Sequence, residues 1–156
     1  MSTQTAIPDA DLVRIVQAYY DAVDSRDAAR VAGTYLDVPT TTLQFNADEP
    51  IMTAEAVREF TAGFFRITSV RHTMIEIWTS PLMGDVVPVD LPPERSPSTM
   101  TVVSTALPTF SVDTRSGVNR LALPATSIFT VDVASGKFVS VHNMFDIAKV
   151  YAALVG

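Results

Sequence analysis

The side chains that can transfer protons give the first indication of function. The chain contains two histidines, His72 and His142, and histidine is the side chain whose ordinary pKa lies nearest to neutral pH. A carboxylate beside a histidine fixes its tautomer and stabilises its charged form. Tyr20 and Asp24 are four residues apart, so on a helix they would lie on one face. These residue types favour general acid–base chemistry.

Other chemistries lack the residues they need. The chain has no cysteine, which excludes a disulfide framework, a thiolate metal site and a cysteine nucleophile. Two histidines are too few for a multi-histidine metal site unless carboxylates supply the other ligands. No G-x-S-x-G string marks a serine nucleophile, and no glycine-rich loop for a phosphate occurs. We therefore expect no cofactor.

Composition restricts the partners. The formal net charge is −6, from 11 basic and 17 acidic residues, and no Lys/Arg run offsets it, so we expect no nucleic-acid partner. Hydrophobic residues make up 47% and charged residues 18%, so much apolar surface must be hidden in a core, a cavity or an interface. Residues 1–10 do not resemble a secretory signal, and no apolar run approaches the ~20 residues of a membrane span. We expect a cytoplasmic protein with no membrane partner.

The order of predicted elements indicates an α+β fold. Helices are expected at 9–24, 28–36 and 54–66, with Asp27 and Thr53 as N-caps of the second and third. Strands rich in β-branched residues, and a short last helix, follow the pattern of an α+β domain in which a strongly curved sheet wraps around helices. The expected strands are 40–45, 69–79, 100–112, 121–132 and 137–146, and the last helix is 146–154.

One segment departs from this pattern. Residues 80–98 contain five of the ten prolines, which exclude a regular central strand, and we interpret the segment as a long loop. A length of 156 residues fits one domain, so we assign residues 1–156 to a single domain.

Three local strings resemble the SnoaL-like proteins of the nuclear-transport-factor-two-like superfamily, which is related to scytalone dehydratase and ketosteroid isomerase. They are Tyr-Asp-Ala-Val-Asp-Ser-Arg-Asp at 20–27, Glu-Ala-Val-Arg-Glu-Phe at 55–60 and Arg-His-Thr at 71–73. The resemblance implies a cone-shaped α+β barrel: a curved, mostly antiparallel sheet and three helices that enclose one apolar pocket, often in a homodimer. Members include dehydratases, isomerases, cyclases, epoxide-opening enzymes and non-catalytic binders, so the superfamily fixes no reaction.

The resemblance to scytalone dehydratase implies a catalytic pair. Asp24 and His72 match the aspartate and histidine that meet in that enzyme's pocket, which makes His72 the general acid/base and Asp24 its orienting partner. The alternative is that Asp24 caps local backbone and His72 is an interior, hydrogen-bonded histidine. The dehydratase's second histidine falls near Thr109 here, and its absence leaves the specific reaction open.

The resemblance to ketosteroid isomerase implies two hydrogen-bond donors. Its phenolic tyrosine aligns with Tyr19 and its second oxyanion donor with Ser127, although Tyr19 could equally be a core aromatic. Its catalytic base falls at Leu43 or Gln44, neither of which accepts a proton, so a steroid-type isomerisation is not expected.

The last strand alternates between two faces. Val139, Val141, Asn143 and Phe145 share one face, and the opposite face carries Phe138, Ser140, His142 and Met144. Aligned with the isomerase, the first face lines the pocket, so Asn143 would orient substrate and Phe145 would contact it. The second face would lie outside, where a second subunit could pack. Gln44 and Trp78 are further pocket candidates.

Together these observations predict a cofactor-independent lyase, isomerase or cyclase that does acid–base chemistry on an apolar, oxygenated small molecule, such as a polyketide- or terpenoid-like intermediate. Tyr19 or Tyr20, together with Asn143, would hold substrate oxygens. The alternatives are a non-catalytic binder of a small hydrophobic ligand and a dimerisation module.

Overall fold

A curved, mixed sheet forms one wall of the structure. The computed structural model describes residues 7–79 and 99–155. The strands run in the order β2-β1-β7-β6-β4-β3, with β5 paired to one end of β4, and all neighbours are antiparallel except β1 and β7. Their bounds are Thr42–Phe45 for β1, Ile51–Met52 for β2, Thr68–Thr79 for β3, Thr99–Thr114 for β4, Gly117–Ala122 for β5, Ala125–Asp132 for β6 and Phe138–Met144 for β7.

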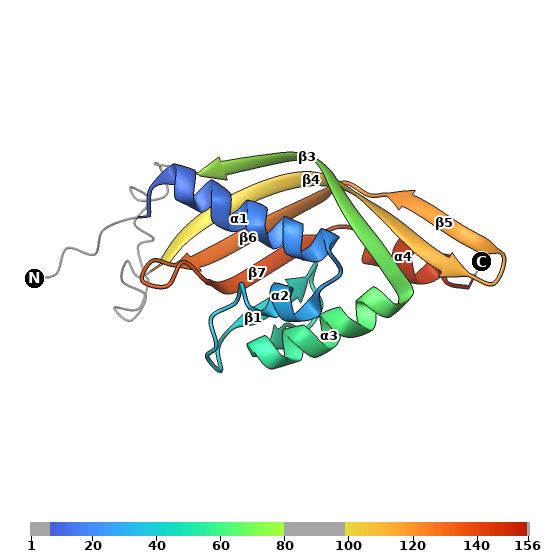
Figure 1. Ribbon diagram of the computed structural model, residues 1–156, viewed down its shortest axis with the longest axis horizontal. Coiled ribbons are helices and arrows are strands. Elements are labelled where there is room, and N and C mark those ends of the chain that lie inside the picture. Colours follow the sequence, from blue (N-terminus) through green and yellow to red (C-terminus); the bar gives the residue numbers. More distant parts are fainter. Residues whose placement is uncertain (1–6, 80–98, 156) are drawn as a thin grey trace, which may run out of the picture.

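The helices close the hollow side of this sheet. They are α1 at Asp9–Asp24, α2 at Ala28–Ala32, α3 at Ala54–Ile67 and α4 at Ile147–Ala153. Helix α1 lies over the sheet (Figure 1). Helix α3 contacts β2 and β3, the strands at the two ends of the sheet order, so sheet and helices surround a common interior. The fold is the predicted α+β class with a mostly antiparallel curved sheet.

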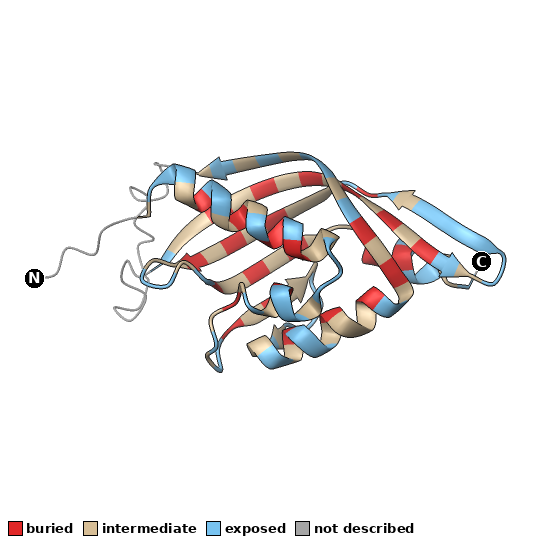
Figure 2. Ribbon diagram, viewed as in Figure 1, coloured by how far each residue is buried: buried red, intermediate tan, exposed pale blue. Residues whose placement is uncertain are grey.

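The helices form where local chemistry favours them. Leu12, Val16, Tyr19 and Tyr20 form one buried stripe on α1, on the side that faces the sheet (Figure 2). Asp27 accepts a hydrogen bond from the backbone N–H of Arg30 at 3.0 Å and caps α2. Thr53 Oγ1 accepts one from Ala56 N at 3.2 Å and caps α3. Both predicted N-caps are confirmed.

Two predicted elements are shorter than expected. Helix α2 ends at Ala32 and not at 36, because the chain then pairs with β7: Leu36 N donates to Phe138 O at 2.8 Å, and Phe138 N to Thr34 O at 2.9 Å. The strand predicted at 121–132 is interrupted at 123–124, where Pro124 offers no N–H, and β5 and β6 therefore pair with different parts of β4.

The last strand corrects the predicted alternation. Thr130 pairs with Ser140 but Val131 pairs with Phe138, so Val139 is an extra residue in β7. Phe138 was predicted on the outer face, and this bulge instead turns it inward, where it is fully buried against Tyr35 and Phe129. Beyond the bulge, Val141, Asn143 and Phe145 point to the interior as predicted.

Two further expectations concern the proline-rich segment and membrane-spanning helices. The proline-rich loop predicted at 80–98 lies outside the described residues. Within residues 7–79 and 99–155, none of the helices combines the length and the apolar content that crossing a membrane requires.

Candidate active site

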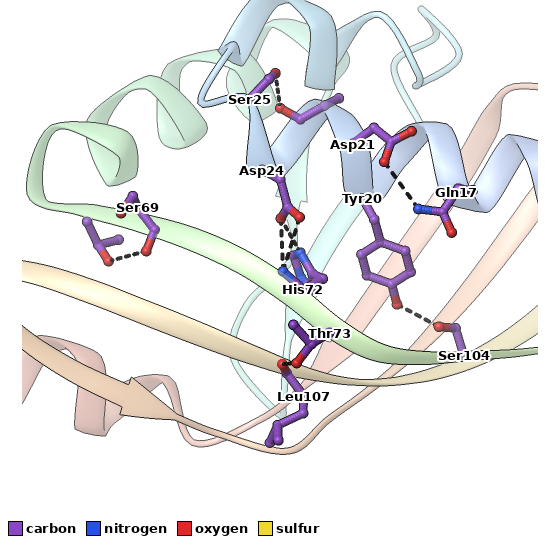
Figure 3. A network of polar contacts seen from close by, with 12 residues as sticks. Gln17, Tyr20, Asp21, Asp24, Ser25, Ser69, His72, Thr73, Ser104 and Leu107 are labelled. Atoms are coloured by element: carbon purple, nitrogen blue, oxygen red, sulfur yellow. Dashed lines mark hydrogen bonds and ion pairs between the residues drawn. The ribbon is translucent and has the colours of Figure 1, made fainter.

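Asp24 and His72 meet at the predicted place. Asp24 is the last residue of α1 and His72 lies near the start of β3 (Figure 3). Asp24 Oδ1 lies 2.6 Å from His72 Nδ1. The backbone N–H of His72 also donates to the same carboxylate, at 3.2 Å to Oδ1 and 3.1 Å to Oδ2. One carboxylate therefore holds both the ring and the backbone of the histidine.

This contact decides which ring nitrogen is available for chemistry. An ionised carboxylate can only accept hydrogen bonds, so with neutral imidazole the proton lies on Nδ1 and Nε2 carries a lone pair. His72 is among the residues that line an interior cavity, whereas Asp24 is not. The side chains of His72 and Asp24 are 11% and 29% exposed. The arrangement offers a proton acceptor to the cavity and places its charge partner behind it.

Tyr20 packs against the histidine. The two ring centroids are 4.5 Å apart, with 52° between the ring planes. The Tyr20 hydroxyl lies 2.7 Å from Ser104 Oγ, a buried contact. Burial raises the pKa of Tyr20, and the hydroxyls of Ser104 and Ser127 partly offset this effect. Tyr20 thus stays a neutral hydrogen-bonding group at physiological pH.

A row of polar side chains crosses the otherwise apolar interior. Ser104, Ser127 and Asn143 are direct partners across β4, β6 and β7. Ser127 Oγ donates to Asn143 Oδ1 at 2.6 Å, which leaves the amide N–H groups of Asn143 to serve other acceptors. Burial raises the pKa of Tyr19, against the opposing effect of the Asn143 side chain nearby. Of these groups, Tyr19, Ser127 and Asn143 line the cavity and give it one hydrogen-bonding wall.

The cavity is lined mainly by apolar side chains, and many of them are aromatic. Its volume is about 640 Å³, including its opening to solvent. The lining residues are Tyr19, Tyr20, Val23, Val31, Leu43, Phe45, Phe60, Thr61, Phe64, Phe65, Val70, His72, Pro108, Phe110, Ala125, Ser127, Asn143 and Phe145.

The structure brings together seven of the nine predicted site residues and excludes two. Tyr19, Tyr20, His72, Ser127, Asn143 and Phe145 line the cavity, and Asp24 supports His72 from behind. The predictions for Gln44 and Trp78 are corrected, since neither lines the cavity.

One register row explains both corrections. Gln44 pairs with His142, His142 with Ile128, Ile128 with Val103, and Val103 with Trp78. Paired residues share a face, and this row alternates with the inward-facing row of Ser104, Ser127 and Asn143. Gln44 and Trp78 therefore lie on the outer face, where Trp78 is 49% exposed.

Sequence reasoning missed Ser104 and Thr61. Both are buried polar residues, with exposed fractions of 0% and 7%. The alternation along β4 places Ser104 on the same inward face as Val102, Ala106, Pro108 and Phe110, and this pattern could have identified it. In the part of the chain that the structure describes, His, Asp and Glu side chains do not gather in the groups of three that would hold a metal ion.

Comparison with known proteins shows the fold. The sequence matches no model of a known protein family and no functionally curated protein. Among solved structures it resembles a proposed polyketide cyclase from Xanthomonas campestris pv. campestris, with 15% identity, a TM-score of 0.69, and coverage of 94% of this chain and 98% of that one.

Two further matches have similar extent. An NTF2-like protein of unknown function from Burkholderia pseudomallei has 13% identity and a TM-score of 0.66, with 94% and 98% of the two chains covered. TerC, crystallised with polyporic acid, has 14% identity and a TM-score of 0.64, with 94% and 99% covered. The chain thus has the NTF2-like, SnoaL-like fold that its sequence strings indicated.

Proposed function

We propose that this NTF2-like chain is a cofactor-independent enzyme, a lyase, isomerase or cyclase that does acid–base chemistry on an apolar, oxygenated small molecule. The substrate would be of polyketide or terpenoid character. The observation that carries the proposal is the 2.6 Å contact between Asp24 and His72, with His72 in the wall of an aromatic cavity. A histidine with a charge partner at the edge of an apolar space is suited to proton transfer at neutral pH.

The residues divide the reaction between them. His72 Nε2 takes a proton from a carbon next to a carbonyl group, and the electron pair moves onto the carbonyl oxygen. The amide of Asn143 and the hydroxyl of Tyr19 or Tyr20 donate hydrogen bonds to that oxygen as it gains charge. Asp24 stabilises the imidazolium that forms. The proton then returns to another carbon in an isomerisation, or to a departing hydroxyl in a dehydration. In a cyclisation the enolate carbon attacks a second carbonyl, whose oxygen takes the proton.

Proton abstraction can be tested before the substrate is known. We expect the protein to accelerate the exchange of solvent deuterium into the carbon next to the carbonyl of 2-tetralone, followed by proton NMR. His72→Gln should lower the protein-dependent rate by about 10²-fold or more. Binding of the ketone without exchange above the buffer rate would contradict the enzyme and favour the binder.

The non-catalytic binder remains the second candidate because of the cavity. Apolar side chains dominate its lining, and TerC shows that a chain of this fold can be crystallised with an oxygenated small molecule. A binder requires no acid–base pair, so binding alone would be insensitive to the charge of Asp24.

We further propose a homodimer that buries the outer sheet face. Trp78, Val103 and Ile128 are neighbours in the outer register row, and Trp78 is 49% exposed. Phe138, which was predicted on this outer face, lies in the core and is not part of it. A mean hydropathy of +0.25 for so small a chain also favours a covered surface.

A further inference from the structure

Five phenylalanines of the cavity form a closed circle of ring contacts. Phe45 contacts Phe60 with centroids 5.3 Å apart, Phe60 contacts Phe64 at 6.1 Å, and Phe64 contacts Phe110 at 6.4 Å. Phe110 stacks on Phe145 at 5.2 Å, and Phe145 returns to Phe45 at 5.8 Å. We call these five side chains the phenylalanine collar. They come from β1, α3, β4 and the residue after β7.

The collar presents its rings to the cavity. All five residues line it, and all but Phe110 are only partly buried, so part of their aromatic surface is accessible. The collar also joins the two hydrophobic clusters of the protein, since Phe45 and Phe60 pack on one and Phe145 on the other, while Phe64 packs on both. Aromatic groups from both sides of the interior therefore meet around one space.

Along β4 the collar and the polar row lie on opposite sides of the residue that pairs with His72, whereas on β1 the collar residue Phe45 pairs directly with Asn143. The inward-facing residues of β4 run Ser104, Ala106, Pro108 and Phe110, of which Pro108 and Phe110 line the cavity. Ser104 belongs to the polar row, Pro108 pairs with His72, and Phe110 belongs to the collar. Along this strand the proton acceptor stands between hydrogen-bonding groups and aromatic rings.

We propose that the phenylalanine collar is the specificity element of the site and that it holds a planar aromatic ring of the ligand. The oxygen-bearing part of the ligand then extends past His72 toward Asn143. That His72 acts on this ligand rests on the proposed function, whereas the selection of an aromatic ring does not.

Ring geometry distinguishes an aromatic from a saturated occupant. Aromatic pairs gain free energy beyond area burial when they meet edge-to-face or offset-stacked with centroids about 4.5–7 Å apart. The collar already uses both arrangements, with interplanar angles of 16° and 19° in its stacked pairs and 87° and 85° in two edge contacts. A flat ring can join such a set, and a puckered saturated ring offers neither the π-face nor the polarised edge.

The test compares two probes with the same carbon skeleton, 2-naphthol and decahydro-2-naphthol, by titration calorimetry on the whole chain. We expect wild type to bind 2-naphthol more tightly. Phe60→Leu and Phe64→Leu should each reduce the affinity ratio of the two probes by about two- to tenfold. The hydroxyls of the two probes differ in acidity, and this difference contributes to the affinity ratio in every variant alike. The change in that ratio between wild type and a collar variant therefore reports the ring contacts.

Phe65→Leu is the matched control. Phe65 lines the cavity from the same helix but makes none of the collar's ring contacts, so its substitution should change both affinities alike. Thermal unfolding checks that each variant is folded, and Phe60→Leu carries the test if Phe64→Leu is not. Equal losses for both probes in the collar variants, or no preference in wild type, would overturn the inference. A preference for 2-naphthol in a protein that shows no deuterium exchange supports the collar and overturns only the acid–base function.

Discussion

The carboxylate of Asp24 accepts two donors from one residue, the ring and the backbone N–H of His72. It therefore ties the end of α1 to β3 and also fixes the imidazole tautomer. These two roles, structural and electrostatic, can be separated by experiment because asparagine keeps the shape and loses the charge.

For the dyad we expect Asp24→Asn to lower the rate of deuterium exchange more than the affinity for 2-tetralone, because the charge acts on the imidazolium formed during proton transfer. His72→Gln should cost at least as much, and the double variant little more than the worse single one, since the two residues act as one unit. Asp21→Asn is the matched control, because Asp21 lies about one turn earlier on α1 and accepts its hydrogen bond from Gln17. Additive losses would contradict a shared role.

Ser127 positions Asn143 and gives a prediction that needs no ligand. Ser127→Ala leaves the buried Asn143 Oδ1 without its donor, so the free energy of unfolding should fall by about 1–3 kcal/mol. Thr126→Ala, one residue earlier and outside the cavity lining, should change it by much less. Urea denaturation measures both. The exchange rate should also fall in Ser127→Ala, because an unrestrained amide holds the substrate oxygen less well.

At the scale of elements, the start of α3 combines a cap with an unusual backbone. Thr53 has φ +79°, which is costly for a β-branched residue, and its hydroxyl caps the helix. Thr53→Ala should lose about 1 kcal/mol of unfolding free energy with the cap, and Thr53→Ser should lose less. Thr53→Gly loses the same hydrogen bond but relieves the strain, so it should be more stable than the alanine variant. Thermal melts of the three variants decide this order.

Elements were predictable from the sequence where local signals were sufficient, as for α1, α3 and the caps at Asp27 and Thr53. They were not predictable where distant chain decides. Helix α2 ends early because Tyr35 bridges to Phe138, a partner about a hundred residues away. The bulge at Val139 depends on the register of β6, and a period-two pattern contains no information on it. The same limit applied to the site. Whether Gln44 and Trp78 face the cavity or the outside depends on the strand register, which the sequence alone does not give.

At the scale of the whole molecule, three buried tyrosines link stability to pH. Burial raises the pKa of Tyr19, Tyr20 and Tyr35; the nearby Tyr19 raises the pKa of Tyr35 further, although the Tyr35 hydroxyl makes no hydrogen bond of normal length among the described residues. Above about pH 10 the unfolded chain releases these protons while the fold retains them. Their contribution to the free energy of unfolding should be constant below about pH 10 and fall as pH rises toward the folded-state values, by up to about 1.4 kcal/mol per unit for each group.

Tyr35→Phe tests this account directly. The substitution removes a buried hydroxyl without a partner, so stability at pH 7 should be unchanged or higher, and the loss above pH 10 should be smaller than in wild type. Denaturant titrations at pH 7, 10 and 11 measure both effects. A variant that is much less stable at pH 7 would show that the hydroxyl is satisfied in solution.

The outer sheet face makes a prediction about assembly. The outer register row places Trp78, Val103 and Ile128 side by side on neighbouring strands, and hiding them in a second copy would remove apolar area from water. We expect light scattering at micromolar concentration to give twice the chain mass of 16.9 kDa. Trp78→Glu should shift the protein toward monomer, because a charge in this apolar row would be buried in the dimer without a partner. Val118→Glu, at a 56% exposed position on β5 outside this row, should leave the mass unchanged. A monomeric wild type, or equal disruption by both variants, would place the contact elsewhere or remove it.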